Sequence, residues 1–184
     1  MKIAICGKMC SGKSTLANSI RRMDKRYTIY SFGSKVKEVA SDLFHMDSSN
    51  KDRTLLTSIG SKMREIDPDV WIKYVIQQIP TNKEHCIIDD LRYQNEYEYL
   101  AKRGWTFIQL TVPRDEQIKR IKQRYPHNYE DHLKADSHES EVNSFQWLKD
   151  KYPALVINST DSEVKIYQQV YSFIQKNEYS KVYK

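Results

Sequence analysis

Residues Gly7 to Ser14 read Gly-Lys-Met-Cys-Ser-Gly-Lys-Ser, a complete G-x-x-x-x-G-K-[ST] phosphate-binding loop, or P-loop. An apolar run at residues 3–6 precedes this loop and a helical pattern follows it, which is the context that the motif requires. Glycines at its two ends let the backbone curl so that successive N–H groups point at phosphate oxygens. The helix that follows aims its positive end at the same anion. The motif therefore indicates that the chain binds a nucleoside triphosphate.

Two side chains of this loop have specific expected roles. Lys13 should reach the β- and γ-phosphates of ATP, and the hydroxyl of Ser14 should ligate Mg²⁺. Cys10 is expected to be a tolerated small residue rather than a reactive, low-pKa thiol. The predicted ATP-binding residues are Gly7, Lys8, Met9, Cys10, Ser11, Gly12, Lys13, Ser14 and Thr15.

Composition adds limits on the class of protein. The 184 residues suit one compact domain, 1–184, with one substantial core. The chain lacks an apolar run near the ~18 residues of a membrane span, and its start lacks a signal-peptide pattern. Three cysteines make no disulfide framework. We therefore expect a cytoplasmic protein without membrane contact. The formal charge of +6 suits nucleic acid and phosphorylated substrates equally, so it does not decide between them.

Apolar runs and helical periodicity alternate along the chain. The expected strands are Lys2–Cys6, Tyr27–Phe32, His85–Asp89, Trp105–Val112 and Ala154–Ile157. The expected helices are Lys13–Arg22, Ser34–Phe44, Lys51–Glu65, Pro68–Ile79, Asn95–Lys102, Asp115–Arg124 and Asp161–Lys176. Alternating strands and helices, with strands that are apolar throughout, predict an α/β fold with a parallel sheet covered on both faces.

Local signals refine this expectation. Asp67 followed by a proline predicts an N-cap before the fourth helix, and Asp161 predicts one before the last helix. The polar stretch Tyr125–Ser140 lacks helical or strand periodicity. A loop of this length in a compact domain is usually functional, for example a lid, or disordered.

The strand Ile87-Ile88 ends in two acids, Asp89 and Asp90, as a Walker B element does. Ligands of parallel sheets gather at the carboxyl ends of the strands, so Asp89 should lie near Mg²⁺ and the phosphates. The alternative is that Asp89 caps a helix, because an acid after an apolar run is also common there.

Several strings in order make the chain resemble the phage- and virus-type deoxynucleoside monophosphate kinases, from Met1 to about Ile174. They are Gly60-Ser61-Lys62-Met63-Arg64-Glu65, Asp69-Val70-Trp71, Asp89-Asp90-Leu91-Arg92-Tyr93-Gln94-Asn95-Glu96, the basic segment Arg114–Arg124, and Ser137-His138-Glu139-Ser140-Glu141. Animal-type phosphomevalonate kinases are more distant relatives of the same pattern. The resemblance implies a three-layer P-loop kinase fold with a five-stranded parallel sheet, an acceptor region near residues 34–80 and a lid near 114–140. It also suggests a homodimer.

The resemblance implies a reaction and a set of residues for it. The γ-phosphate of ATP would pass, with Mg²⁺, to a deoxynucleoside monophosphate. The catalytic residues would be Lys13, Arg92, Arg120 and Arg124; the acceptor-binding residues Lys35, Arg64, Trp71, Asp90, Arg92 and Glu139; and the metal ligands Ser14 and Asp89. Planar, permanently charged guanidinium groups suit this chemistry, which needs alignment and charge neutralisation.

Alternatives remain for these residues. Arg64 would serve equally in a salt bridge, Trp71 in the core, and Arg120 with Arg124 on a solvated basic face. A kinase of another phosphorylated acceptor, such as phosphomevalonate, is the second enzyme reading. A GTPase switch is disfavoured, since neither 82–85 nor 158–161 completes the N-K-x-D string. A nucleic-acid-dependent ATPase lacks a recognisable binding module, so no stable nucleic-acid binding is expected.

Overall fold

The computed structural model describes residues 1–47, 51–134 and 155–182. The strands are β1 (Lys2–Gly7), β2 (Thr28–Tyr30), β3 (Cys86–Leu91), β4 (Thr106–Thr111) and β5 (Leu155–Asn158). They form one parallel sheet in the order β2-β3-β1-β4-β5. The predicted α/β fold with a five-stranded parallel sheet is therefore confirmed. The P-loop follows β1, the central strand, and this is where strand order reverses and ligands of such sheets bind.

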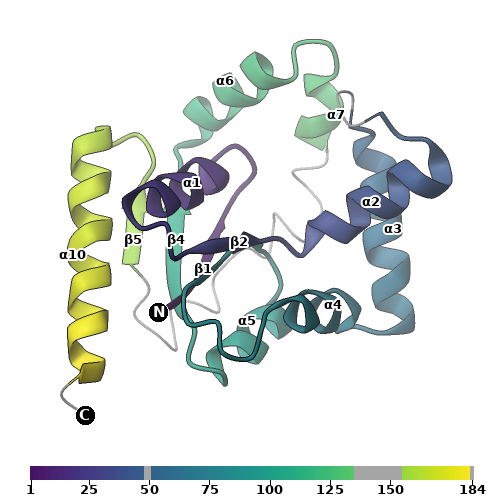
Figure 1. Cartoon of the computed structure of the whole chain (residues 1–184). Helices are drawn as coiled ribbons and strands as arrows, with labels where there is room; N and C mark the ends of the chain where they lie inside the picture. The colour runs from purple at the N-terminus through teal and green to yellow at the C-terminus, as the bar shows by residue number, and fades with distance from the viewer. Residues whose placement is uncertain (48–50, 135–154, 183–184) are drawn as a thin grey trace.

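Helices connect the strands, as parallel pairing requires. They are α1 (Lys13–Met23), α2 (Gly33–Phe44), α3 (Arg53–Ile66), α4 (Val70–Gln78), α5 (Gln94–Ala101), α6 (Arg114–Arg124), α7 (Tyr129–Lys134) and α10 (Glu163–Val182). Figure 1 shows α6 and α7 standing apart from the sheet at one edge, with α2 and α3 at another. Within the described residues, no helix has both the length and the apolar character to cross a membrane.

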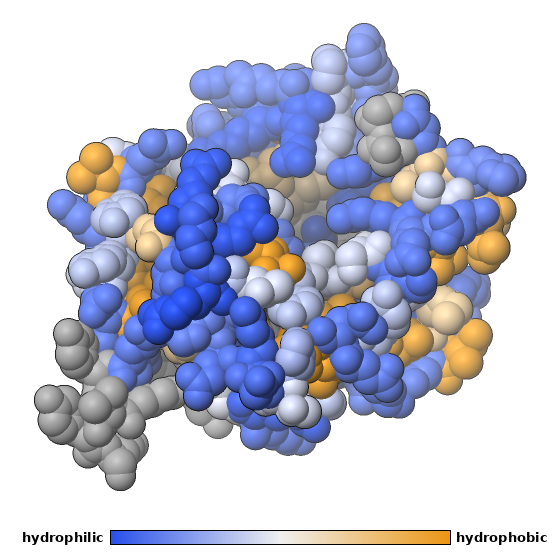
Figure 2. Space-filling model, viewed as in Figure 1, coloured by the Kyte–Doolittle hydropathy of each residue, from blue (hydrophilic) through white to orange (hydrophobic). Residues whose placement is uncertain are grey.

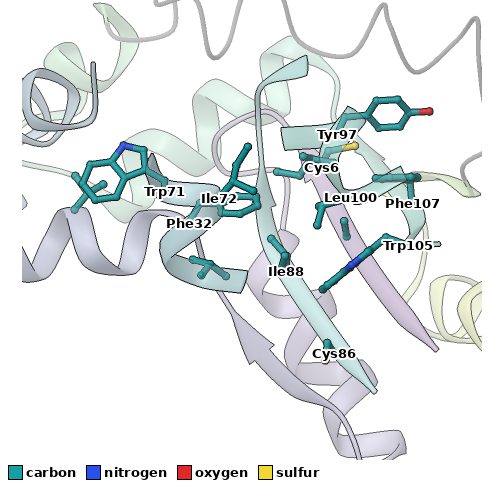
Figure 3. Close-up of a cluster of buried hydrophobic side chains, with 14 of the residues drawn as sticks. Cys6, Phe32, Trp71, Ile72, Cys86, Ile88, Tyr97, Leu100, Trp105 and Phe107 are labelled. Atoms are coloured by element: carbon teal, nitrogen blue, oxygen red, sulfur yellow. The ribbon is translucent and has the colours of Figure 1, made fainter. Parts of the chain in front are cut away.

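Alternation along the strands divides the core into two clusters. On one face, Ile3 and Ile5 of β1 pack with Leu16 and Ile20 of α1 and with Val170 of α10. On the other face, side chains of β1 and β3 pack with α2, α4 and α5. Figure 3 shows this second cluster around Ile88 and Leu100. The two clusters make the three layers of helix, sheet and helix.

Three local predictions were wrong. Helix α4 begins at Val70, and its N-cap is Asp69 rather than Asp67, although Asp67 Oδ1 does accept the backbone N–H of Asp69. Ser162, not Asp161, receives the N–H of Lys165 at the start of α10. Asp161 instead pairs with the Lys165 side chain, 3.0 Å away. The stretch after Tyr125 also contains a short helix, α7, that its polar composition did not reveal.

Candidate active site

The P-loop backbone takes conformations that favour glycine at both ends. Gly7 has φ +147°, and a Cβ atom there would lie 2.5 Å from the carbonyl oxygen of Leu110 on β4. Gly12 has φ +96°, but a Cβ atom there would meet nothing within 4 Å. Cys10 between them has φ +59° without being glycine. The loop is thus fixed by close packing at its start and by backbone conformation further on.

Lys13 and Ser14 open helix α1 at the end of this loop. The Nζ of Lys13 donates to the carbonyl oxygens of Gly7 and Lys8, at 2.7 and 2.8 Å. The hydroxyl of Ser14 donates to Oδ2 of Asp89 over 2.7 Å. Asp89 belongs to β3, the neighbour of β1, so sheet pairing brings these distant residues together. The P-loop and the acid of the Walker B-like string thus share one site.

Asp89 is electrostatically unusual. Burial, together with the charge of Asp90, raises the pKa of its carboxyl group, and the hydrogen bond from Ser14 and the charges of Lys37 and Lys13 oppose this rise. A hydroxyl and a carboxylate side by side are oxygen ligands that suit Mg²⁺, which completes its shell with water and phosphate oxygens. The described residues hold no group of three or more His, Cys, Asp or Glu for a metal. The donors at Ser14 and Asp89 therefore fit a magnesium ion that arrives with a nucleotide.

Asp90 serves the start of helix α2. Its Oδ2 accepts the hydroxyl of Ser31 at 2.7 Å and the N–H of Gly33 at 2.8 Å, and its Oδ1 accepts the N–H of Phe32 at 2.7 Å. A Cβ atom on Gly33 would lie 3.1 Å from Oδ2. Asp90, a predicted acceptor-binding residue, lines a cavity beside this turn, and its carboxylate also anchors the turn itself.

Two cavities flank the P-loop. The first, about 600 Å³, lies on the side of α2, α3 and α4; the second, about 710 Å³, lies on the side of α6 and α10. Cys10, Gly12, Thr15 and Arg124 line both. Figure 2 shows a hollow in the surface bordered largely by hydrophilic side chains. A phosphate chain bound in the P-loop would therefore be accessible from two directions.

The first cavity is rich in cations. Its basic residues are Lys13, Lys37, Lys51, Arg53, Arg64, Arg92 and Arg124, and its acids are Asp89, Asp90 and Glu96. Sequence reasoning identified neither Lys37, Lys51 nor Arg53, because none of them belongs to a motif. They come from α2, from the segment before α3 and from the first residue of α3. Only the fold gathers these separate side chains around one cavity.

Arg64, which is predicted to bind the acceptor phosphate, lines the first cavity and is also paired. Its Nη2 lies 3.2 Å from Oε1 of Glu96, its Nη1 donates to the carbonyl of Gly60, and its guanidinium lies 4.1 Å from the ring centre of Tyr93. Sequence reasoning named the salt bridge as the alternative for Arg64, and the structure contains it. The chain thus holds Arg64 rigidly, with its charge partly balanced.

Glu96 was missed as a site residue, although it lies in the motif string. It is buried, and its Oε2 accepts the N–H groups of Arg92 and Tyr93 at 2.8 and 3.0 Å. Burial raises its pKa to about 7 against the opposing effects of Arg64 and of these two N–H groups. An acid three residues after a helix N-cap is the capping-box signal that could have identified it.

Two of the residues predicted to bind the acceptor do not line the first cavity. Trp71 is 3% exposed, packs in the core shown in Figure 3, and donates from Nε1 to the carbonyl of Gly60. Lys35 is not among the cavity residues; it pairs with Glu38 at 2.6 Å and lies over the ring of Tyr74. Trp71 lies inward because its apolar helix must cover the sheet. Glu139 and its neighbours at 137–141 lie outside the described residues.

The predicted lid arginines differ in their surroundings. Arg120 lines only the second cavity, where it donates to Oγ and the carbonyl of Ser159, at 2.9 and 3.0 Å, and pairs with Glu116. Arg124, one turn further along α6, lines both cavities. The basic face of α6 is therefore turned toward the site at these two residues.

Helix α6 also holds the P-loop directly. Gln117 is fully buried, and its Nε2 donates to the carbonyl oxygen of Met9 over 3.1 Å. The sulfur of the same Met9 lies 3.4 Å from Nη2 of Arg53 on α3. Met9 is therefore the point where α6, the P-loop and α3 meet. No sequence pattern around Gln117 indicates that it contacts the P-loop, because polar residues on a helix usually face solvent.

Comparison with protein families gives one match over most of the chain. A family model described as an AAA domain matches residues 3–144, which include the P-loop, the Walker B-like acids and helix α6. No curated protein sequence matches significantly.

Solved structures match along nearly the full length. A gluconokinase from Sinorhizobium meliloti has a TM-score of 0.59 at 11% identity, with 98% of this chain and 96% of that one covered. A dephospho-CoA kinase from Campylobacter jejuni has a TM-score of 0.56 at 18% identity, covering 98% and 100%. Kti12 from Chaetomium thermophilum, solved with ADP-AlF3, has a TM-score of 0.56 at 16% identity, covering 95% and 98%. At these identities the matches establish a shared P-loop kinase-like fold.

Proposed function

The chain belongs to the AAA-domain family of P-loop proteins, and on that premise we propose that it is an ATP-dependent phosphotransferase acting on a phosphorylated acceptor, specifically a deoxynucleoside monophosphate kinase. Its immediate product would be the deoxynucleoside diphosphate. Residues 1–184 would form one catalytic domain, with residues 114–140 as a lid and residues 34–80 as the acceptor region.

The observation that carries this proposal is the pair of cavities that meet at the P-loop. The second cavity, which contains Arg120, would take the nucleoside of ATP. The first cavity would take the acceptor. Its many basic residues suit an acceptor that brings negative charge of its own, whereas the hydroxyl of an uncharged acceptor would need fewer of them.

Aromatic side chains support a nucleotide as that acceptor. Phe32, Tyr74 and Tyr93 line the first cavity together with the aliphatic Leu56. Flat aromatic and apolar surfaces suit a nucleobase. A small aliphatic acceptor such as phosphomevalonate has no such ring to stack against them. This lining, together with the resemblance of the motif strings, favours a deoxynucleoside monophosphate over the second enzyme reading.

The chain's own residues would act by alignment and charge neutralisation. The P-loop N–H groups would hold the β- and γ-phosphates, and Lys13 would turn from the carbonyls of Gly7 and Lys8 toward them. Ser14 and Asp89 would hold Mg²⁺, which supplies charge neutralisation on the phosphates when bound. An oxygen of the acceptor phosphate would attack the γ-phosphorus as the bond to the β–γ bridging oxygen breaks. Arg124 would face the charge that develops between the two cavities.

No general base is needed for this acceptor. A phosphate monoester has its second pKa near 6, so it is already largely a dianion at neutral pH. A hydroxyl acceptor would instead require a residue that removes its proton. Closure of α6 and α7 would exclude water, so that the acceptor phosphate receives the phosphoryl group in preference to solvent.

A coupled assay tests the proposal. ATP and Mg²⁺ are supplied with each deoxy- and ribonucleoside monophosphate, with phosphomevalonate, and with single-stranded DNA as a stimulator of ATP hydrolysis. We expect ADP release that depends on a deoxynucleoside monophosphate. ADP release that depends only on phosphomevalonate would mean that the acceptor is phosphomevalonate and not a nucleotide. ADP release driven only by DNA would mean that the protein is a nucleic-acid-dependent ATPase and not a kinase.

A further inference from the structure

The most basic part of the first cavity does not contain Arg64. Lys37, Lys51, Arg53 and Arg124 line the cavity and act on one another electrostatically. Arg64 has Glu96 beside it, but none of Lys37, Lys51 and Arg124 has an ion-pair partner in residues 1–47, 51–134 and 155–182. Side chains of like charge that converge on a cavity repel one another unless an anion joins them.

A buried histidine lies against this cationic group. His132 of α7 is 1% exposed, and neither of its ring nitrogens has a hydrogen-bond partner among the residues described. Its ring stacks on Tyr125, with centroids 3.7 Å apart and planes at 16°, and Tyr125 lines the first cavity. A buried polar group without a partner is costly, so a charge that enters the cavity beside His132 should affect its protonation.

We propose that Lys51, Arg53 and Arg124 form a binding site for a phosphate dianion in the first cavity, with His132 buried beside it behind Tyr125. The site joins the segment before α3, the start of α3 and the end of α6, and α7 lies next to it. Guanidinium groups bind phosphate with paired N–H donors, and lysine adds a point charge. Two sources share this chemistry, the phosphate of an acceptor and free inorganic phosphate. The acceptor as source rests on the proposed function, whereas the anion site itself does not.

The electrostatics of His132 agree with this assignment. Burial lowers its pKa first, Arg53, Arg124 and Lys51 lower it further, and the exposed Asp131 on its own helix opposes them. Burial and the same neighbours also lower the pKa of Lys51. A dianion among these groups reverses the balance, so binding of phosphate should raise the pKa of His132. A histidine far from the bound anion would not respond.

The experiment follows the ring proton signals of the histidines by NMR across pH, in the full chain. Three probes are compared: inorganic phosphate, thymidine monophosphate, and thymidine without phosphate. We expect both phosphate-containing probes to raise the pKa of His132 by about 1 or more, and thymidine to leave it unchanged. A response to inorganic phosphate alone assigns the site to the free ion. No response to either phosphate probe, or an equal response to thymidine, overturns the anion site.

A pair of variants completes the test. Lys51→Met should weaken binding of inorganic phosphate about 10-fold, whereas Lys119→Met, the same change at an exposed position of α6, should not alter it. Wild-type phosphate affinity in Lys51→Met would also overturn the site. If phosphate shifts His132 but the coupled assay finds no phosphorylated acceptor, the anion site stands and the proposed function fails. Normal turnover with an unresponsive His132 rejects the anion site alone.

Discussion

The hydroxyl of Ser14 donates a 2.7 Å hydrogen bond to Oδ2 of Asp89, although the two residues are 75 positions apart in the chain. Parallel pairing of β1 with β3 places the end of one strand beside the end of the other, so the P-loop helix starts next to the acid. This pair holds the oxygen donors that the proposed chemistry needs for Mg²⁺.

Asp89→Asn should weaken the binding of ATP with Mg²⁺ and slow turnover, because an amide is a poorer ligand for a hard cation than a carboxylate. The raised pKa of Asp89 adds a pH dependence: in the wild type, magnesium-dependent ATP affinity should begin to fall at a higher pH than for an ordinary aspartate as the solution is acidified. Titration of ATP binding against Mg²⁺ and pH measures both. An unchanged magnesium dependence in the variant would make Asp89 only a partner of Ser14.

Lys13→Met should reduce kcat by on the order of 100- to 1,000-fold while the fold is kept, because Lys13 is proposed to neutralise charge in the transition state. Its present partners are two loop carbonyls, so the variant removes hydrogen bonds as well as charge. Circular dichroism and thermal melting provide the control for folding. Near-normal turnover in a folded variant would remove the P-loop from the mechanism.

Gly7→Ala and Gly12→Ala form a matched pair within the P-loop. A Cβ atom on Gly7 would lie 2.5 Å from the Leu110 carbonyl, whereas one on Gly12 would enter open space at a positive φ. We expect Gly7→Ala to lose much more unfolding free energy than Gly12→Ala, which should lose only about 1–2 kcal/mol of conformational strain. Chemical denaturation of both variants measures the difference. Equal losses would mean that backbone conformation, not contact with β4, selects glycine at position 7.

The sheet could be predicted from the sequence because its strands are apolar runs and its helices show a clear period. Errors arose at the ends of helices, where neighbouring polar groups compete to cap the helix and this competition decides where it begins. Asp67, for example, precedes a proline as a helix cap would, but Asp69 is the N-cap of α4. Helix α7 was missed because its polar residues give no apolar face to recognise, although His132 within it is buried.

The site was predictable where one motif supplies it and not where several elements do. The P-loop and Asp89 follow from local strings, and the structure places Ser14 within hydrogen-bond distance of Asp89. Lys51 and Arg53 reach the first cavity only through the packing of α3, and no local pattern indicates this. Trp71 is the opposite case: its place in a motif string suggested the acceptor site and left the core as the alternative, and its helix turns it into the core.

Substitutions of Arg120 and Arg124 should affect different kinetic constants. Arg120 lines only the second cavity, so Arg120→Ala should raise KM for ATP, with loss of its bonds to Ser159. Arg124 lines both cavities, so Arg124→Ala should mainly lower kcat, since it can face the transferring phosphoryl group. Steady-state kinetics in both substrates, with Lys119→Ala as the exposed control on α6, measure this split. Identical losses in both variants would reject this split, and wild-type kinetics in both would return α6 to the alternative of a solvated basic face.

Glu96→Gln tests whether burial or the ion pair with Arg64 dominates the pKa of Glu96. Burial raises the pKa of Glu96 to about 7 from an ordinary 4.5, so the folded state binds more protons than the unfolded chain between these pH values. Stability contributed by this group is therefore greatest at the acidic end and should fall as the pH rises toward 7. The glutamine variant lacks this titration but keeps a carbonyl oxygen for the N–H groups of Arg92 and Tyr93.

We therefore expect the unfolding free energy of the wild type, relative to Glu96→Gln, to decrease between pH 4.5 and about 7. Urea denaturation at several pH values measures this difference, and Glu98→Gln, the same change at an exposed position on α5, is the control. If the ion pair with Arg64 outweighed burial, the pKa of Glu96 would lie below 4.5 and wild-type stability would instead increase above it. The sign of the slope thus decides whether an ionised Glu96 balances the charge of Arg64, or whether that charge is left unbalanced for a phosphate in the first cavity.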